Sequence, residues 1–226
     1  MLLPNMTYKE AFEEINKDYE DIQKGEQKIC QQFTRFLLKT TRRFPILQRY
    51  TYTTPVRKNK LCFICTSSKR NIDAQSGISI YIIWDNAYGK NVIWMNKLVH
   101  DRRNGRYGLI VVMTSHLFSR YRERFLKDQD MTNEEVINHF MERNCQMVGT
   151  DISNELLPGS MELEDRSKLK IAYVSQQGVS FGVVVETEVV LMKTFVSYDM
   201  LYPNQEAILL PMRDKLMEMV PPALRV

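Results

Sequence analysis

One stretch of the chain, LIVVMTSHLFSRYRERF (residues 109–125), joins a strand-like run to an amphipathic one. Leu109–Met113 is apolar and rich in β-branched residues, which favours a buried strand. The residues after it fit a helix at about 100° per residue. One face of that helix is polar and carries His116, Arg120, Glu123 and, at its edge, Arg124. The opposite face is apolar and carries Leu117, Phe118, Tyr121 and Phe125, so we expect it to dock on a sheet.

The residue types on the polar face could bind a phosphate and move a proton. The imidazole of His116 has an unperturbed pKa of about 6.5, and a neighbouring carboxylate such as Glu123 would raise that pKa. Arg120 and Arg124 could hold a phosphate through paired hydrogen bonds. The alternative is a solvated helix face on which Arg120, Glu123 and Arg124 pair with one another.

A second cation, Lys193, lies within an apolar run. Both alternating sets of positions in Val189–Val196 are mostly apolar, which predicts a central strand covered on both faces. A lysine in such a strand should lie near the strand end, reach a cavity or pair with an anion. If the strand lies beneath the His116 helix, Lys193 adds a further positive charge to the candidate site.

The composition is that of a folded protein. The chain has 226 residues, of which 44% are hydrophobic and 26% charged, enough to bury a core in one large domain or two small ones. A net charge of +4 does not by itself announce a nucleic-acid binder. Basic clusters occur at 42–43, 57–60, 69–70, 102–106 and 120–124. They would bind a polyanion if several met on one face, and otherwise they are solvated surface charges.

Some classes of protein are disfavoured by the sequence. It contains no secretory leader and no run of about 18 apolar residues, so we expect a soluble, cytoplasmic protein that does not enter a membrane. Cys30, Cys62, Cys65 and Cys145 fit reduced thiols, and Cys62 and Cys65 lie three apart in a strand-like run, where they would face opposite ways. With three histidines and no nucleotide-binding or metal-binding motif, we expect neither a metal nor a cofactor.

The pattern along the chain predicts an α+β fold with a mainly antiparallel sheet flanked by helices. Residues 1–46 show two helical seams separated by Lys24-Gly25, which predicts a helical hairpin appended to a main domain at 47–226. Residues 47–107 form a β-meander, and strands are expected at 48–53, 61–67, 78–84, 92–96 and 108–113. Tyr81, Trp84 and Trp94 are either core residues, which we favour, or a stacking platform for bases.

The second half of the chain continues this fold. Thr132-Asn133-Glu134-Glu135 is a capping box that begins a second helix, with His139 toward its polar side. The buried stripe of that helix would be Val136, Ile137, Phe140 and Met141. Residues 149–165 have no period and contain Pro158-Gly159, which predicts a loop. Strands at 169–175, 179–186 and 189–197 then form hairpins, and 198–226 forms a helical tail that Pro211 kinks or divides.

The order of these elements resembles the compact RelE-like ribonuclease toxins, in particular their BrnT branch. Those domains have a Ser/Thr-His step that opens a helix with arginines one and two turns on. A second helix led by an acidic pair and Val follows, then a Gly-containing strand and a final strand with a Thr-aromatic step. The matching residues here are Ser115-His116, Arg120, Arg124, Glu134-Glu135-Val136, Gly178 or Gly182, and Thr194-Phe195. The resemblance covers a core at 108–197, and the hairpin, the meander, the tail and the long loop depart from it.

The resemblance implies metal-independent RNA cleavage, in which the 2′-hydroxyl attacks the adjacent phosphorus. His116 would act as base or acid, and Arg120 and Arg124 would stabilise charge on the phosphoryl oxygens. The sequence therefore predicts an RNA-binding protein with the residues of a toxin-like endoribonuclease. The rival hypothesis is a non-catalytic interaction module on the same scaffold, in which the N-terminal hairpin holds a protein partner or a second copy of the chain.

Overall fold

The computed structural model describes residues 1–70, 77–95, 100–101, 105–127, 129–144, 146–153, 156–157 and 168–220. Within these ranges the strands are β1 (Ile46–Thr53), β2 (Lys60–Ser67), β3 (Gly77–Asn86), β4 (Gly89–Met95), β5 (His100–Asp101), β6 (Arg106–Tyr107), β7 (Ile110–Met113), β8 (Val148–Ile152), β9 (Lys170–Val174), β10 (Gly178–Glu186) and β11 (Val189–Ser197). Cys145 and the Pro158-Gly159 part of the predicted loop lie outside the described residues.

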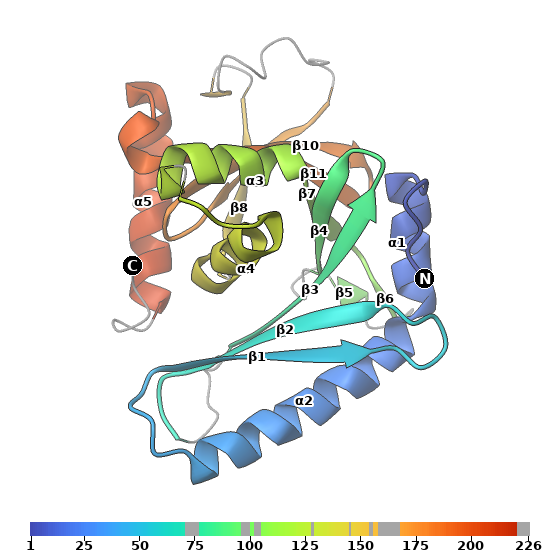
Figure 1. Cartoon of the computed structure of the whole chain (residues 1–226). Coiled ribbons are helices and arrows are strands. Elements are labelled where there is room, and N and C mark those ends of the chain that lie inside the picture. The colour runs from blue at the N-terminus through green and yellow to red at the C-terminus, as the bar shows by residue number, and fades with distance from the viewer. Residues whose placement is uncertain are drawn as a thin grey trace.

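The described strands form one large sheet and one small ribbon (Figure 1). The large sheet has nine strands in the order β1-β2-β3-β4-β7-β11-β10-β9-β8, and the ribbon pairs β5 with β6. Neighbouring strands of the large sheet are antiparallel except for β7 and β11, which are parallel. The predicted α+β fold with a mainly antiparallel sheet is therefore confirmed.

Helices cover both faces of the sheet. The helices are α1 (Tyr8–Lys17), α2 (Tyr19–Lys39), α3 (Ser115–Tyr121), the π-helical turn η1 (Arg122–Leu126), α4 (Asn133–Arg143), the 3-10 turn η4 (Tyr198–Met200) and α5 (Pro203–Met219). The buried apolar residues of α1, α2 and α5 share one core cluster with one face of the strands. Those of α3, η1 and α4 share a second cluster with the other face. None of the described helices is long and apolar enough to cross a membrane.

The centre of the sheet confirms the prediction for β11. It lies between β7 and β10, and its side chains are buried on both faces. The register pairs Ile110 with Val189 and Met113 with Met192. At the end of β7 the backbone N–H of Thr114 donates to the Met192 carbonyl (3.1 Å), and the Thr114 hydroxyl caps α3 by accepting from the Leu117 N–H (3.3 Å). The His116 helix therefore starts at the middle of the sheet.

The N-terminal helical hairpin is present, but the predicted break at Lys24-Gly25 is wrong. The helices meet at Asp18, and α2 runs through Gly25 without interruption. The Asp18 carboxylate is buried and accepts hydrogen bonds from Thr54 Oγ1 and Asn59 Nδ2, both at 2.7 Å, which ties the junction to the loop after β1. Gly25 serves close packing instead, because a Cβ there would lie 2.5 Å from Cδ1 of Tyr52.

Two further elements differ from the sequence-based expectations. Val148–Ile152, most of it inside the predicted loop, forms the edge strand β8, because pairing with β9 outweighs the weak strand preference of Gly149 and Asp151. Of the two outcomes expected at Pro211, the division into two helices is wrong, because the tail continues through Pro211 as the single helix α5. The predictions for α4 hold, because the Thr132 capping box begins the helix and the predicted stripe is buried.

Tyr81, Trp84 and Trp94 are core residues, as we favoured. Their exposed fractions are 0%, 2% and 8%, which leaves no aromatic face free to stack on bases. The CxxC prediction also holds, because Cys65 belongs to the core cluster on one face of β2 while Cys62 packs against the cluster on the other.

The contact between Gly25 and Tyr52 predicts that Gly25→Ala has opposite effects on stability in the wild-type protein and in a Tyr52→Ala variant. Gly25→Ala should lower the free energy of unfolding by about 1–2 kcal/mol, although alanine is the better helix former, because its Cβ clashes with the ring. In a Tyr52→Ala background the same substitution should stabilise by about 0.5–1 kcal/mol. Urea unfolding measures both differences. An equal effect in the two backgrounds would show that the ring does not require the glycine.

Candidate functional site

The predicted amphipathic helix is present as α3 followed by η1. Leu117, Phe118 and Tyr121 are buried against the sheet, whereas His116 is exposed and Arg120 is half-buried. The polar face is thus open to solvent because the apolar face anchors the helix. Electrostatics also links the predicted cluster, because Arg120, Arg124 and Glu123 all act on the pKa of His116.

The two arginines of the predicted cluster already have partners within the chain. Arg120 donates to Glu123 Oε2 at 2.6 Å, and Arg124 donates to the Phe195 carbonyl of β11, also at 2.6 Å. A π-helical turn holds one more residue than an α-helical turn, so Arg124 does not follow the α-helical extrapolation of the sequence. Arg124 therefore fastens η1 to the sheet, and Arg120 pairs along the helix as the alternative interpretation expected.

The pKa of His116 is lowered, so the predicted rise is wrong. Partial burial has the largest effect and lowers the pKa, and the positive charges of Arg120 and Arg124 lower it further. Glu123 raises it, as expected from its charge, but has the smallest effect. The imidazole is consequently neutral at pH 7 and can accept a proton.

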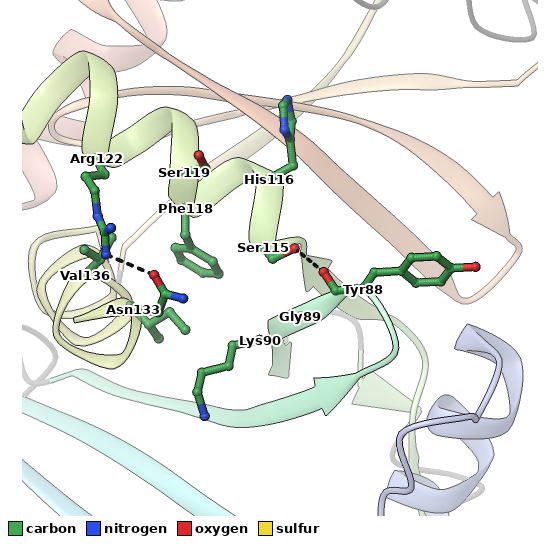
Figure 2. A pocket seen from close by; sticks show the side chains of 11 residues that line it. Tyr88, Gly89, Lys90, Ser115, His116, Phe118, Ser119, Arg122, Asn133 and Val136 are labelled. Atoms are coloured by element: carbon green, nitrogen blue, oxygen red, sulfur yellow. Dashed lines mark hydrogen bonds between the residues drawn. The ribbon is translucent and has the colours of Figure 1, made fainter. Parts of the chain in front are cut away.

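A hollow of about 420 Å³ lies beside α3, between the β3–β4 turn and the first turns of α4 (Figure 2). Its floor is apolar and includes Phe118, Val136 and Ile137. Its polar lining comes from Ser115, His116, Ser119 and Arg122 on the helices, Asn133 on α4, and Tyr88 and Lys90 around the turn. The described lining residues include no carboxylate, so the charged groups of the hollow are cationic.

The turn between β3 and β4 is fixed against the start of α3. Ser115 Oγ donates to the Tyr88 carbonyl at 2.8 Å (Figure 2), and the Ser115 N–H donates to Asn91 Oδ1 at 2.8 Å. Gly89 has φ +115, a conformation that other residues rarely adopt, and a Cβ there would lie 3.1 Å from Ser115 Cβ. This close approach places Lys90 on the wall of the hollow.

The two long cations of the hollow are held differently. Arg122 donates to the Met131 carbonyl (2.7 Å) and to Asn133 Oδ1 (3.0 Å), which fixes it between η1 and α4. Lys90 pairs with Asp85 at 3.1 Å, and the Asp85 side chain is 65% exposed. Such exposed ion pairs contribute little free energy, so Lys90 can turn from Asp85 to an anion.

The described lining of this hollow contains one of the five predicted site residues, His116. Arg120, Glu123 and Arg124 lie along the helix next to it. Lys193 follows Met192 in β11, beside the start of α3, and is half-buried at a shift in the β10–β11 register. The lining also contains Lys90, Ser119, Arg122 and Asn133, which were not among the predicted site residues. The spacing of Ser115, Ser119 and Arg122, which is four and then three residues, could have revealed this polar row.

A buried polar network lies between α3 and α4 and was also missed. The Gln177 N–H donates to Asn144 Oδ1 (3.2 Å), so the Asn144 Nδ2 group faces Gln177 Oε1 and donates to it (2.9 Å). The Tyr121 hydroxyl donates to the same Oε1 (2.6 Å). The Tyr121 oxygen must then accept from His139 Nδ1 (2.8 Å), which leaves Nε2 of a neutral His139 as an acceptor. The sequence placed Tyr121 only on the apolar face of its helix. In the structure the Tyr121 hydroxyl also orients His139.

No group of three or more His, Cys, Asp or Glu side chains in the described ranges is arranged to hold a metal ion. Comparison with protein-family models, curated proteins and solved structures finds no match for the chain. The RelE/BrnT resemblance therefore stays a prediction, and the function is argued from the residues of the hollow.

The network predicts that the Tyr121 hydroxyl stabilises the fold. Tyr121→Phe should lower the free energy of unfolding by about 1–3 kcal/mol, because it removes a donor from the buried Gln177 and an acceptor from the half-buried His139. Tyr88→Phe is the matched control, since Tyr88 is 84% exposed, and should change stability by less than about 0.5 kcal/mol. Chemical denaturation compares the two variants. Equal losses would show that the network adds nothing to the packing of the ring.

Proposed function

We propose that this protein binds RNA at the hollow between α3, α4 and the β3–β4 turn. The observation that carries the proposal is the charge of the lining, in which Lys90 and Arg122 lie beside an apolar floor without a carboxylate among the described residues, and the neutral His116 lines the same hollow. Cationic side chains bind phosphates, and an apolar floor accepts the face of a base or a ribose. A volume of about 420 Å³ lies within the usual range for small-ligand sites and suits one nucleotide.

Two features of the rim support RNA. Ser119 offers an exposed hydroxyl in the lining, and such groups contact phosphate and ribose oxygens in nucleic-acid complexes. The ring of Tyr88 points outward from the turn beside the hollow and is mostly exposed (Figure 2), and an exposed aromatic ring can stack on a neighbouring base. These groups add contacts that a simple inorganic anion would not use.

The hollow supports binding more strongly than cleavage. Cleavage through the 2′-hydroxyl needs a base and an acid, and the neutral His116 has the protonation state of the base. The described lining residues include no second imidazole and no carboxylate that could supply the acid. The resemblance casts Arg120 and Arg124 as phosphate ligands, but neither is among the described lining residues, and Arg124 is held by the Phe195 carbonyl. We therefore propose binding as the function, with cleavage as an additional measurement.

The hairpin is less suited to the rival role of an interaction module. Its apolar seam, including Phe12, Ile15, Ile22 and Phe33, is buried in the core shared with the sheet. A partner that docked through this seam would have to displace the sheet. The RNA proposal needs no such rearrangement, because the cationic lining is open to solvent.

Replacing Lys90 tests the proposal. Lys90→Gln should weaken binding of a single-stranded RNA about tenfold at low salt and reduce the slope of log affinity against log salt by about 0.7, because one phosphate contact is lost. Arg35→Gln removes the same charge from the exposed side of α2, over the opposite face of the sheet, and should change affinity less than about twofold.

Fluorescence anisotropy with a labelled RNA measures these affinities. If Lys90→Gln and Arg35→Gln weaken binding equally, RNA affinity depends on net charge alone. The hollow would then not be the RNA-binding site. A gel of the same RNA, incubated without divalent metal, measures cleavage. Cleavage that His116→Ala abolishes would extend the proposal from binding to catalysis.

The lowered pKa of His116 predicts how binding depends on pH. The imidazole is neutral at pH 7 and gains a positive charge as the pH falls through its pKa, below the ordinary 6.5. RNA affinity should therefore rise several-fold between about pH 7.5 and about pH 5.5, and His116→Ala should remove most of that rise. His139→Gln is the control, since the pKa of His139 is also lowered but its ring does not line the hollow. An unchanged pH profile in His116→Ala would exclude His116 as a phosphate contact.

A further inference from the structure

A second hollow of about 500 Å³ adjoins the first, and Lys90 lines both. Its walls come from β1, β2 and β3 on one side and from Glu134 and Asn138 of α4 on the other. The first hollow is bounded by Asn133 of the same helical turn. The two hollows are therefore neighbours, separated by Lys90 and the beginning of α4.

The charges of the second hollow do not suit a phosphate. Arg49 and Lys60 line it together with Asp85 and Glu134, so both signs are present. Arg49 pairs with Glu142 at 2.9 Å, and Lys90 pairs with Asp85. Carboxylates repel a phosphate, whereas the described lining of the first hollow contains cations and no carboxylate. A neutral polar group fits this surface better.

The uncharged lining suits the flat, polar ring of a base. Cys62 and Ile83 supply half-buried apolar surface, and burial raises the pKa of the Cys62 thiol, which keeps it uncharged. The Tyr81 hydroxyl donates to Asn138 Oδ1 (3.1 Å), which leaves the Asn138 Nδ2 group as a donor. Glu134 lies four residues before Asn138 on α4, so an acceptor and a donor stand one helical turn apart. Base edges carry donors and acceptors side by side.

We infer that the two hollows together bind two consecutive nucleotides of single-stranded RNA, with the linking phosphate on Lys90 and the second base between Asn138, Glu134 and the sheet. This inference rests on the proposed RNA binding at the first hollow and adds the class of RNA. A base enters the second hollow only when it is unpaired, because a double helix keeps its bases stacked inside. The site therefore distinguishes single strands from duplexes.

The test uses the full chain and three probes: a short single-stranded RNA of mixed sequence, the same RNA annealed to its complement, and the same RNA with abasic residues. The single strand should bind at least about tenfold more tightly than the other two, because each stacked and hydrogen-bonded base contributes about that factor. Wild-type protein is sufficient for this comparison, so it does not depend on the folding of a variant.

Asn138→Asp provides the matched variant. It keeps an oxygen for the Tyr81 hydroxyl but removes the Asn138 donors and adds a negative charge, so single-stranded binding should weaken about tenfold while duplex binding changes less than about twofold. Gln48→Glu adds the same charge on β1 beside Arg49, where alternation points it to the opposite face of the sheet, and should leave both probes within about twofold.

The outcomes separate the two proposals. If none of the three probes binds, the proposed RNA binding itself fails. If all three bind equally and Asn138→Asp has no effect, RNA binding at the first hollow stands and the assignment of a base to the second hollow is overturned. Tighter binding of the single strand that depends on Asn138 but not on Gln48 supports the two-nucleotide site.

Discussion

The backbone N–H of Thr114 donates to the carbonyl of Met192 where two neighbouring strands of the described sheet run parallel. This bond continues the β7–β11 ladder to Thr114, the N-cap of the His116 helix, and the Thr114 hydroxyl then caps that helix. Everything at the candidate site is positioned from there. Ser115 fastens the β3–β4 turn, the turn carries Lys90, and Arg124 fastens the far end of the helix to Phe195.

Strands and amphipathic helices were predicted well, because their signals are local. The apolar runs of β2, β3 and β11 and the capping box at Thr132 each depend on a few adjacent residues. The errors occurred where a distant contact decides the structure. Gly25 ends no helix because it meets the ring of Tyr52, and the helices part at Asp18 because Thr54 and Asn59 bind its carboxylate.

The candidate site could be predicted only in part, for the same reason. Helical spacing brings His116, Arg120 and Glu123 together, and the structure agrees. Spacing cannot reveal that Arg124 is drawn to a carbonyl of β11, that burial outweighs Glu123 in setting the pKa of His116, or that Lys90 arrives from another part of the chain. The spacing of Ser115, Ser119 and Arg122 is visible in the sequence. Their position opposite the β3–β4 turn depends on the three-dimensional fold and could not be predicted from that spacing.

The parallel pairing of β7 with β11 also has a consequence for the newly made chain. Ile110 pairs with Val189, so the ribosome must add the whole of α3, α4, β8, β9 and β10 before β7 gains its second neighbour. Until then the aromatic side of α3, with Tyr121 and Phe118, lacks Phe195 beneath it. Late closure of long-range strand pairs slows folding and leaves such surfaces open to aggregation or to a chaperone during synthesis.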